Sequence, residues 1–198
     1  MDEDRIIREA QKGSVAAFNQ LVMTYQGLAY NVAYRVIGQP DAAADACQDA
    51  FLKAYHAIKQ HQGGSFKSWL MRIVTNTCYD QLRYKKRRPA TSLEGMTEDS
   101  SEEYNPNLMS EAEHPEEFAL RGELNELIHL GINQLPEDQR VVLVLSDVDG
   151  FSYQEIAEVI DQPLGTVKSR LSRARRRLRD YLIEQKELLP SQYRPTDV

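Results

Sequence analysis

One stretch near the C-terminus, residues 152–179 (SYQEIAEVIDQPLGTVKSRLSRARRRLR), constrains the fold more than any other. Apolar residues at helical spacing predict a short helix over 153–160. Residues 161–165 then interrupt this helix, because proline cannot donate a backbone hydrogen bond and glycine favours a turn. A second helix is expected to follow, with Thr166 as its N-cap.

The second helix of this stretch is predicted to be basic and half-buried. Its apolar face carries Val167, Leu171, Ala174 and Leu178. Most of the remaining surface is cationic: Lys168, Arg170, Arg173, Arg175, Arg176, Arg177 and Arg179. Two short helices with a tight turn match the helix-turn-helix that places side chains in a DNA major groove. A solvated basic helix at the end of a globular domain is the alternative, and the turn, cap and apolar stripe argue against it.

The formal net charge of −6 is unusual for a nucleic-acid-binding protein, but the charge is unevenly distributed. Basic residues concentrate in 83–88 and 168–179, whereas residues 89–117 contain no Lys or Arg. A polyanion responds to local potential, so two basic patches can bind DNA on an acidic protein.

Composition indicates a soluble protein of one or two domains, with 198 residues, 41% hydrophobic and 27% charged. No apolar run could span a membrane and the N-terminus lacks a signal-peptide pattern, so we expect a cytoplasmic protein without membrane insertion. Cys47 and Cys78 are expected to be buried thiols, and the four histidines lack ligand spacing. Asp45 and Asp49 lack a third ligand. We therefore predict no metal, no cofactor and no catalytic residue.

Three helices are predicted in the N-terminal half. The first covers 16–37, and the second starts with Asp41 as its N-cap and runs to about residue 60. A glycine-containing loop, 61–65, leads to the third, which covers 66 to about 87. Trp69 falls in the buried stripe of this third helix, so core packing is its expected role.

Residues 90–117 are expected to form a linker, because they are rich in Ser, Asn, Pro and acidic residues and lack apolar periodicity. So long a segment without structure favours two domains over one. An apolar run within 137–148 could be a strand, but Pro136 and the acids after it favour a helix start. The prediction is an all-α fold of two small helical domains, 1–89 and 118–185, joined by a flexible acidic linker, 90–117, with a tail, 186–198.

Four stretches, taken in order, resemble the extracytoplasmic-function type of bacterial RNA polymerase sigma factor. They are 44–55 (ADACQDAFLKAY), 66–76 (FKSWLMRIVTN), 135–140 (LPEDQR) and 165–175 (GTVKSRLSRAR). Each motif is modestly specific, but four in this order around an acidic linker are highly specific. The resemblance implies an initiation factor, not an enzyme, that binds core RNA polymerase and directs promoter-specific transcription initiation. Residues 1–89 would be sigma region 2 and 118–185 would be sigma region 4.

The same resemblance implies residues for the N-terminal domain. Core polymerase would bind the second helix through Asp45, Gln48, Asp49, Phe51 and Lys53. The melted −10 promoter element would contact the loop and third helix through Gly63, Gly64, Ser65, Arg72, Asn76, Arg83, Lys85, Lys86, Arg87 and Arg88. A glycine loop suits an extruded base, an asparagine can read a base edge, and the basic cluster can hold phosphates.

For the C-terminal domain the resemblance implies duplex recognition of the −35 element. The residues concerned would be Thr166, Lys168, Ser169, Arg170, Arg173, Arg176 and Arg177, with Lys168 and Arg170 ranking first in specificity. Asp161 stands where many helix-turn-helix sequences use glycine, and Asp tolerates a left-handed backbone better than most residues. An anti-sigma factor that masks both domains is a further implied partner.

Two other classes of protein share parts of this pattern. A helix-turn-helix repressor or activator would explain 152–179 but not the second basic cluster after Asn76. A nuclease or recombinase with a DNA-binding tail would need a metal-binding carboxylate cluster or an activated nucleophile, and the N-terminal half shows neither.

Overall fold

The computed structural model describes residues 3–87 and 115–186, and of residues 115–121 it describes only the backbone. Regular structure in these ranges is helical throughout, which confirms the all-α prediction. The elements in chain order are α1 (Glu3–Gln11), α2 (Val15–Ile37), α3 (Pro40–Ala57), the 3-10 turn η1 (Ile58–Gln60), α4 (Phe66–Arg87), α5 (Pro115–Asn133), α6 (Glu137–Leu143), the π-helical turn η2 (Val144–Val148), α7 (Tyr153–Ile160) and α8 (Leu164–Glu184).

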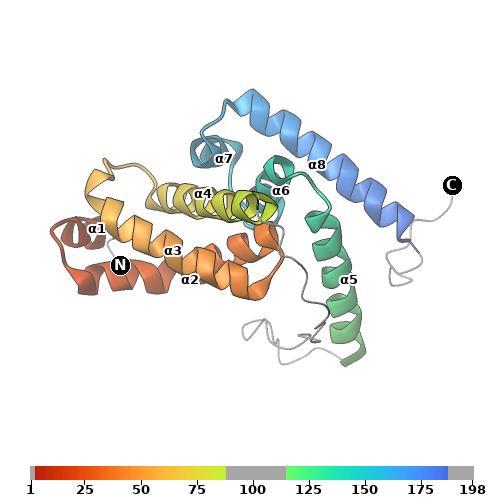
Figure 1. Ribbon diagram of the computed structural model, residues 1–198, viewed down its shortest axis with the longest axis horizontal. Coiled ribbons are helices and arrows are strands. Elements are labelled where there is room, and N and C mark those ends of the chain that lie inside the picture. The colour runs from red at the N-terminus through yellow and green to blue at the C-terminus, as the bar shows by residue number, and fades with distance from the viewer. Residues whose placement is uncertain (1–2, 88–114, 187–198) are drawn as a thin grey trace.

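In the N-terminal half, α2, α3 and α4 pack around a common core, and α1 lies against α2 (Figure 1). The predicted helices correspond to α2, α3 and α4, and the predicted loop separates η1 from α4. Gly63 and Gly64 in that loop adopt φ of 96° and 82°, a left-handed backbone that favours glycine. α1 lies outside the predicted elements, because Ile7 and Ala10 are its only buried residues and make no extended stripe.

The prediction that Asp41 is the N-cap of α3 is wrong. Gln39 holds the N-cap position and Pro40 the first helical position, where the missing proline N–H leaves no intrahelical bond unmade. Asp41 lies one residue further in, where its carboxylate still faces the positive end of the helix dipole.

The helix-turn-helix of α7 and α8 is present as predicted. Ser152 caps α7, its hydroxyl accepting from the Glu155 N–H while the Glu155 carboxylate accepts from the Ser152 N–H. Asp161 ends α7 at φ 53° and ψ 50°, which is the left-handed conformation expected there. Residues 137–148 are helical in α6 and η2, so the choice of helix over strand is confirmed.

Thr166 is not the N-cap of α8, contrary to the prediction. Pro163 holds that position and α8 begins at Leu164. The missing N–H of proline is tolerated there, because the N–H groups at the start of a helix have no intrahelical partner. Thr166 therefore lies within the first turn, where its carbonyl accepts a hydrogen bond from the Ser169 hydroxyl.

The two halves pack directly on each other. α7 lies along α4, and α5 and α6 lie against α2 (Figure 1). Buried apolar side chains of both halves form one cluster. Of the predicted linker, residues 115–117 belong to α5, and 90–114 lie outside the described residues, as does the tail from 187 onward.

Arg140, the last residue of the 135–140 motif, joins the halves at their centre. Its buried guanidinium donates to the Val36 carbonyl at the end of α2 (2.6 Å). It also donates to the carbonyl of Asn133, the last residue of α5 (2.5 Å), and to that of Leu135 in the turn that follows (3.0 Å). Since the last carbonyls of a helix have no intrahelical partner, one cation satisfies helix ends from both halves.

Candidate nucleic-acid and partner interfaces

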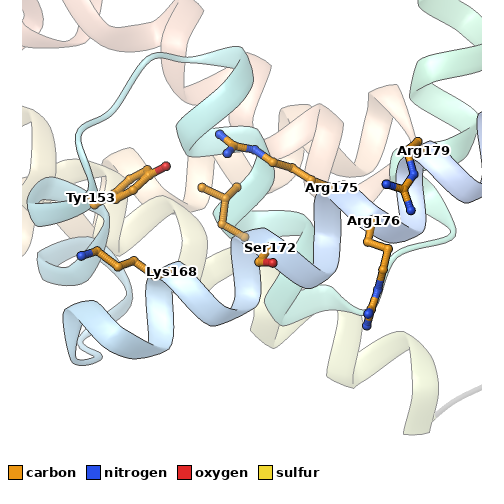
Figure 2. A pocket seen from close by; sticks show the side chains of 7 residues that line it. Tyr153, Lys168, Ser172, Arg175, Arg176 and Arg179 are labelled. Carbon is orange, nitrogen blue, oxygen red and sulfur yellow. The ribbon is translucent and has the colours of Figure 1, made fainter.

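A basic concavity lies on one side of the helix-turn-helix (Figure 2). It has a volume of about 620 Å³ and is lined by Tyr153, Lys168, Leu171, Ser172, Arg175, Arg176 and Arg179. Tyr153 and Lys168 lie at one end and Arg179 at the other. Lys168, Ser172 and Arg176 follow one another at four-residue spacing and are exposed, so they present a continuous polar face to a polyanion.

One cation of this concavity is committed to the fold of the C-terminal half. Arg175 donates two hydrogen bonds to the Asp147 carboxylate, at 2.8 and 2.6 Å. These bonds hold the pKa of Asp147 below its usual range. Lys168 and Arg176, by contrast, have no ion-pair partner among residues 3–87 and 115–186.

The residues predicted for the −35 element are spread over several sides of α8. Lys168 and Arg176 line the concavity, whereas Ser169, Arg173 and Arg177 are exposed beyond its lining and Thr166 is half-buried. Arg170 is turned toward α6, where its Nε lies 3.2 Å from Asp138 Oδ2 and its side chain is 25% exposed.

Four polar residues that line the concavity were not among the predicted −35 contacts: Tyr153, Ser172, Arg175 and Arg179. Arg175 and Arg179 lie in the basic run that was noted, but the direction of their side chains depends on the packing of α8. Ser172 could have been found from its four-residue spacing to Lys168 and Arg176.

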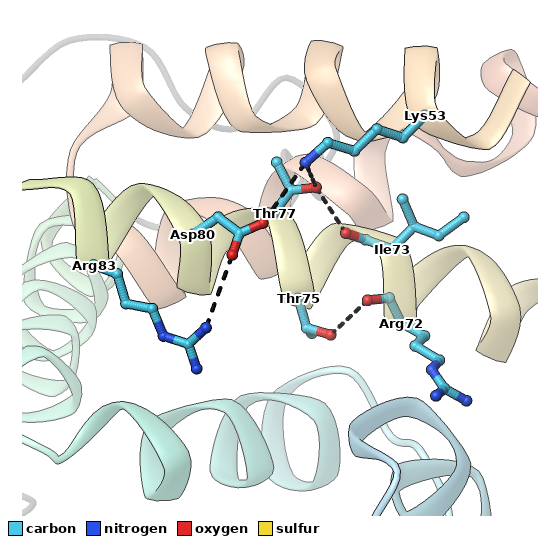
Figure 3. A network of polar contacts seen from close by, with 7 residues as sticks. All are labelled: Lys53, Arg72, Ile73, Thr75, Thr77, Asp80 and Arg83. Carbon is cyan, nitrogen blue, oxygen red and sulfur yellow. Dashed lines mark hydrogen bonds and ion pairs between the residues drawn. The ribbon is translucent and has the colours of Figure 1, made fainter. Parts of the chain in front are cut away.

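A second set of polar and basic side chains follows α4. Arg72, Asn76 and Arg83 are exposed, and helical spacing puts them on one face. Figure 3 shows Arg72 and Arg83 pointing away from α3, while Lys53 reaches α4 from α3. Lys53 donates to Thr77 Oγ1 at 3.1 Å, so this residue, predicted for polymerase binding, contacts α4 instead of projecting freely.

Two of the predicted −10 cations are paired with the C-terminal half. Arg72 Nη2 lies 2.8 Å from Asp161 Oδ2, and Lys86 Nζ lies 2.7 Å from Glu137 Oε1. Lys85 instead donates to Gln39 Oε1 at 2.9 Å.

The remaining −10 candidates flank the ends of α4. Gly63, Gly64 and Ser65 are exposed before its first turn, and Ser65 Oγ accepts from the Ser68 N–H at the start of the helix. Arg87 donates to the Arg83 carbonyl at 3.4 Å, and Arg88 lies outside the described residues.

An apolar groove of about 480 Å³ runs between α2 and α3. Its lining comprises Val22, Gln26, Gly27, Tyr30, Ala44, Cys47, Gln48 and Phe51. Gln48 and Phe51 were predicted to bind polymerase, and Asp45 and Asp49 are exposed on the same helix. Helical spacing puts Met23, 71% exposed, on the α2 side of the groove.

Both cysteines are free and buried, as predicted. Burial raises the pKa of Cys47 to about 11 and that of Cys78 to about 12, so both thiols are protonated near neutral pH. Within the described ranges, no three His, Cys, Asp or Glu side chains gather as a metal ion would need. The described helices include none that is long and apolar enough to cross a membrane.

Comparison with known proteins decides the family. Residues 21–88 match the family described as Sigma-70 region 2, and residues 125–178 match Sigma-70, region 4. The chain is 37% identical to the RNA polymerase sigma-H factor of Pseudomonas aeruginosa over 174 residues, which cover 87% of this chain and 90% of that relative. It is 39% identical to the ECF RNA polymerase sigma-E factor of Escherichia coli over 171 residues, covering 86% and 88%. The chain belongs to the extracytoplasmic-function family of RNA polymerase sigma factors.

The sigma factor therefore acts with RNA polymerase in promoter-specific transcription initiation, and the repressor alternative falls away. Solved structures with similar folds include CnrH in complex with the cytosolic domain of CnrY, with a TM-score of 0.64 and 28% identity, covering 91% of this chain and 97% of that one. Another is the sigma factor RpoE in complex with the anti-sigma factor NepR from Bartonella quintana, with a TM-score of 0.63 and 26% identity, covering 85% and 98%. The groove and α4 lie within the region 2 match, and α7 and most of α8 within the region 4 match.

Proposed function

We propose that the sigma factor uses three separate surfaces in initiation. The α2–α3 groove binds core RNA polymerase, the loop 61–65 with α4 holds the melted −10 strand, and the α7–α8 concavity binds the −35 duplex. The observation that carries this assignment is the separation of apolar from cationic surface. The groove lining contains no Lys or Arg, whereas the polar lining of the concavity is mostly Lys and Arg.

The groove suits a protein helix better than a nucleic acid. Its walls are apolar apart from Gln26 and Gln48, and Asp45 and Asp49 lie on the same helix as Gln48. An amphipathic helix recognised by a groove needs apolar contact with a few polar groups for orientation, and acidic neighbours favour a basic partner.

Each DNA surface supports a different kind of contact. On α4, Asn76 can read a base edge between Arg72 and Arg83, which supply charge to the backbone. On α8, Lys168, Ser172 and Arg176 face outward in series, as a helix in a major groove requires. We assign Arg170 to support of α8 through Asp138, in place of the leading base contact expected from its position alone.

Three further assignments complete the proposal. The protein carries no catalysis of its own, since RNA synthesis belongs to the polymerase. It works in the cytoplasm, where the polymerase and promoter meet. An anti-sigma factor binds it, a proposal supported by the RpoE complex with NepR among its structural neighbours.

Promoter-directed transcription by core polymerase, with and without the sigma factor, tests the proposal. Gln48→Arg places a cation in the groove and should abolish stimulation while leaving −35 duplex binding intact. Arg176→Ala should weaken duplex binding while leaving core binding intact. Gln20→Arg, an exposed position on α2 outside the groove lining, is the matched control and should behave as wild type. Equal loss with Gln48→Arg and Gln20→Arg would contradict the groove assignment.

A further inference from the structure

The C-terminal half covers one flank of the helix proposed to hold the −10 strand. Ser68 and Thr75 lie outside the apolar stripe by which α4 packs against the N-terminal half, yet they are only 3% and 1% exposed. Helical spacing places them on one flank with Tyr79 and Lys86, next to Arg72. Burial raises the pKa of Tyr79 to about 12, and charges on α6 and α8 also act on this residue. α4 therefore buries a second side, against the other half.

Cations along this flank are occupied by groups of the C-terminal half. Arg72 is paired with Asp161 and Lys86 with Glu137, at 2.8 and 2.7 Å. The Lys67 ammonium lies 3.7 Å from the centre of the Phe151 ring. Carboxylates at these distances take the same hydrogen bonds that phosphate oxygens of DNA would take, so the strand and the C-terminal half compete for the same cations.

Specific contacts fit the two halves together away from α4. The rings of Tyr34 and His129 stack with centroids 4.6 Å apart. Gly38 admits the Asn133 side chain, since a Cβ at Gly38 would lie 2.9 Å from its Oδ1. With the Arg140 guanidinium on the Val36 carbonyl, these contacts define one docked position for the C-terminal half.

We propose that this arrangement is a closed, self-inhibited state, in which the C-terminal half withholds one flank of α4, with Arg72 and Lys86, from DNA until the halves separate. The inference rests on the proposed function, because it takes α4 as the −10 helix. The Arg72–Asp161 and Lys86–Glu137 ion pairs form the rim of the contact between the halves. They are partly exposed and individually weak, so the closed state can open. The groove and the α8 concavity stay accessible in it, so polymerase and the −35 duplex can dock before α4 is released.

A charge-matched pair of variants tests the competition. Asp161→Asn with Glu137→Gln removes both rim carboxylates, and Asn keeps the left-handed backbone at 161. Glu9→Gln with Asp180→Asn removes two carboxylates whose partners, Lys12 and Arg179, are close neighbours in the chain and belong to the same half. A single-stranded oligonucleotide with the −10 sequence of a promoter used by the wild-type holoenzyme should bind the rim variant roughly three- to tenfold more tightly than the control. X-ray scattering should give the rim variant the larger radius of gyration. Equal affinity and equal radius would overturn the inference.

A reversible cross-link supplies the decisive test. Tyr34→Cys with His129→Cys, joined by a short reducible bifunctional thiol reagent, locks the halves through positions outside the proposed DNA contacts, while the native thiols stay buried. The unlinked variant should initiate with core polymerase, and the linked form should lose at least tenfold in promoter-directed transcription and recover on reduction. Single variants given the same reagent should be unaffected. Full activity of the linked form would overturn the inference, whereas failure of the wild type to stimulate core would contradict the proposed function itself.

Discussion

α4 and α8 are both long basic helices, but among the described residues only α4 has cations that pair with carboxylates of the opposite half. On α8, Lys168 and Arg176 face an open concavity without an ion-pair partner in the described chain. On α4, Arg72 and Lys86 are held by carboxylates of the other half. The amino-acid sequence makes both helices basic and so suited to a polyanion. Contacts between the halves determine which of their cations are already paired.

Removing Arg140, the cation that joins the halves, should have the largest effect on the contacts that pair the α4 cations. Arg140→Met leaves three carbonyls, two of them at helix ends, without this donor, so we expect the free energy of unfolding to fall by about 3 kcal/mol. Urea unfolding of the full chain measures the change. Arg175→Met, which breaks an exposed ion pair, should cost about 1 kcal/mol or less and serves as the control. Equal costs would show that Arg140 does not join the halves.

Asp149, which lies near charged residues of the N-terminal half, gives a pH-dependent test. Asp149 Oδ2 is buried without a hydrogen-bond partner, and burial raises the pKa of Asp149 to about 6 despite Arg35 and Lys67 from the N-terminal half. The folded state therefore binds a proton more tightly than the unfolded chain, in which the pKa of Asp is about 3.9, so the free energy of unfolding falls as pH rises from about 4 to 6.

Asp149→Asn should remove that loss. We expect it to stabilise the protein by about 2 kcal/mol at pH 7 and to have little effect below about pH 4, where Asp is also neutral. Denaturant unfolding across this pH range is the measurement. An identical pH slope in wild type and variant would contradict the buried position of this carboxylate.

The proposed −35 contacts of α8 can be tested by comparing two of its arginines. Arg176→Ala should weaken binding of a −35 duplex to the free protein by about tenfold, because the duplex loses contact with an exposed cation of the concavity. Arg170→Ala should affect duplex binding less and lower stability more, since Asp138 loses its partner. Fluorescence anisotropy at one fixed salt concentration measures the first effect and urea unfolding the second. The reverse ranking in DNA binding would restore Arg170 as the leading contact.

Local signals predicted most of the helices. The stripe of Val167, Leu171 and Ala174 and the turn before it were enough to identify α8. The errors at Asp41 and Thr166 have one cause: a proline just upstream starts each helix earlier than the capping side chain suggested. The sequence pattern thus predicted the elements well and their first residues less well.

Contacts between distant residues could not be predicted in this way. Arg72 and Asp161 are 89 positions apart, and each is an ordinary exposed charge in its local sequence. The groove was half predicted, because Gln48 and Phe51 belong to a recognisable motif, whereas Gln26 and Tyr30 join them only through the packing of α2 on α3. Gly27 was an available signal, since a glycine within a long helix is unfavourable.

Gly27 also gives the smallest and most specific prediction, on a surface that the contact between the halves leaves accessible. A Cβ at Gly27 would meet nothing within 4 Å, so no packing within the described chain requires glycine there. Glycine in a helix interior costs up to about 1 kcal/mol relative to alanine, and Gly27→Ala should stabilise the free protein by about that amount. The same substitution should weaken core polymerase binding, because the added methyl group enters the groove.

Gly122→Ala provides the matched control for this prediction. Gly122 lies within α5 and is exposed, and a Cβ at this position would likewise meet nothing within 4 Å, so its substitution should give a similar gain in stability. It lies away from the groove and should leave core binding unchanged. Urea unfolding and competition for core polymerase separate the two effects. If both variants bind core as tightly as wild type, the polymerase does not approach the backbone closely at Gly27. It then contacts the groove along its α3 wall, at Gln48 and Phe51.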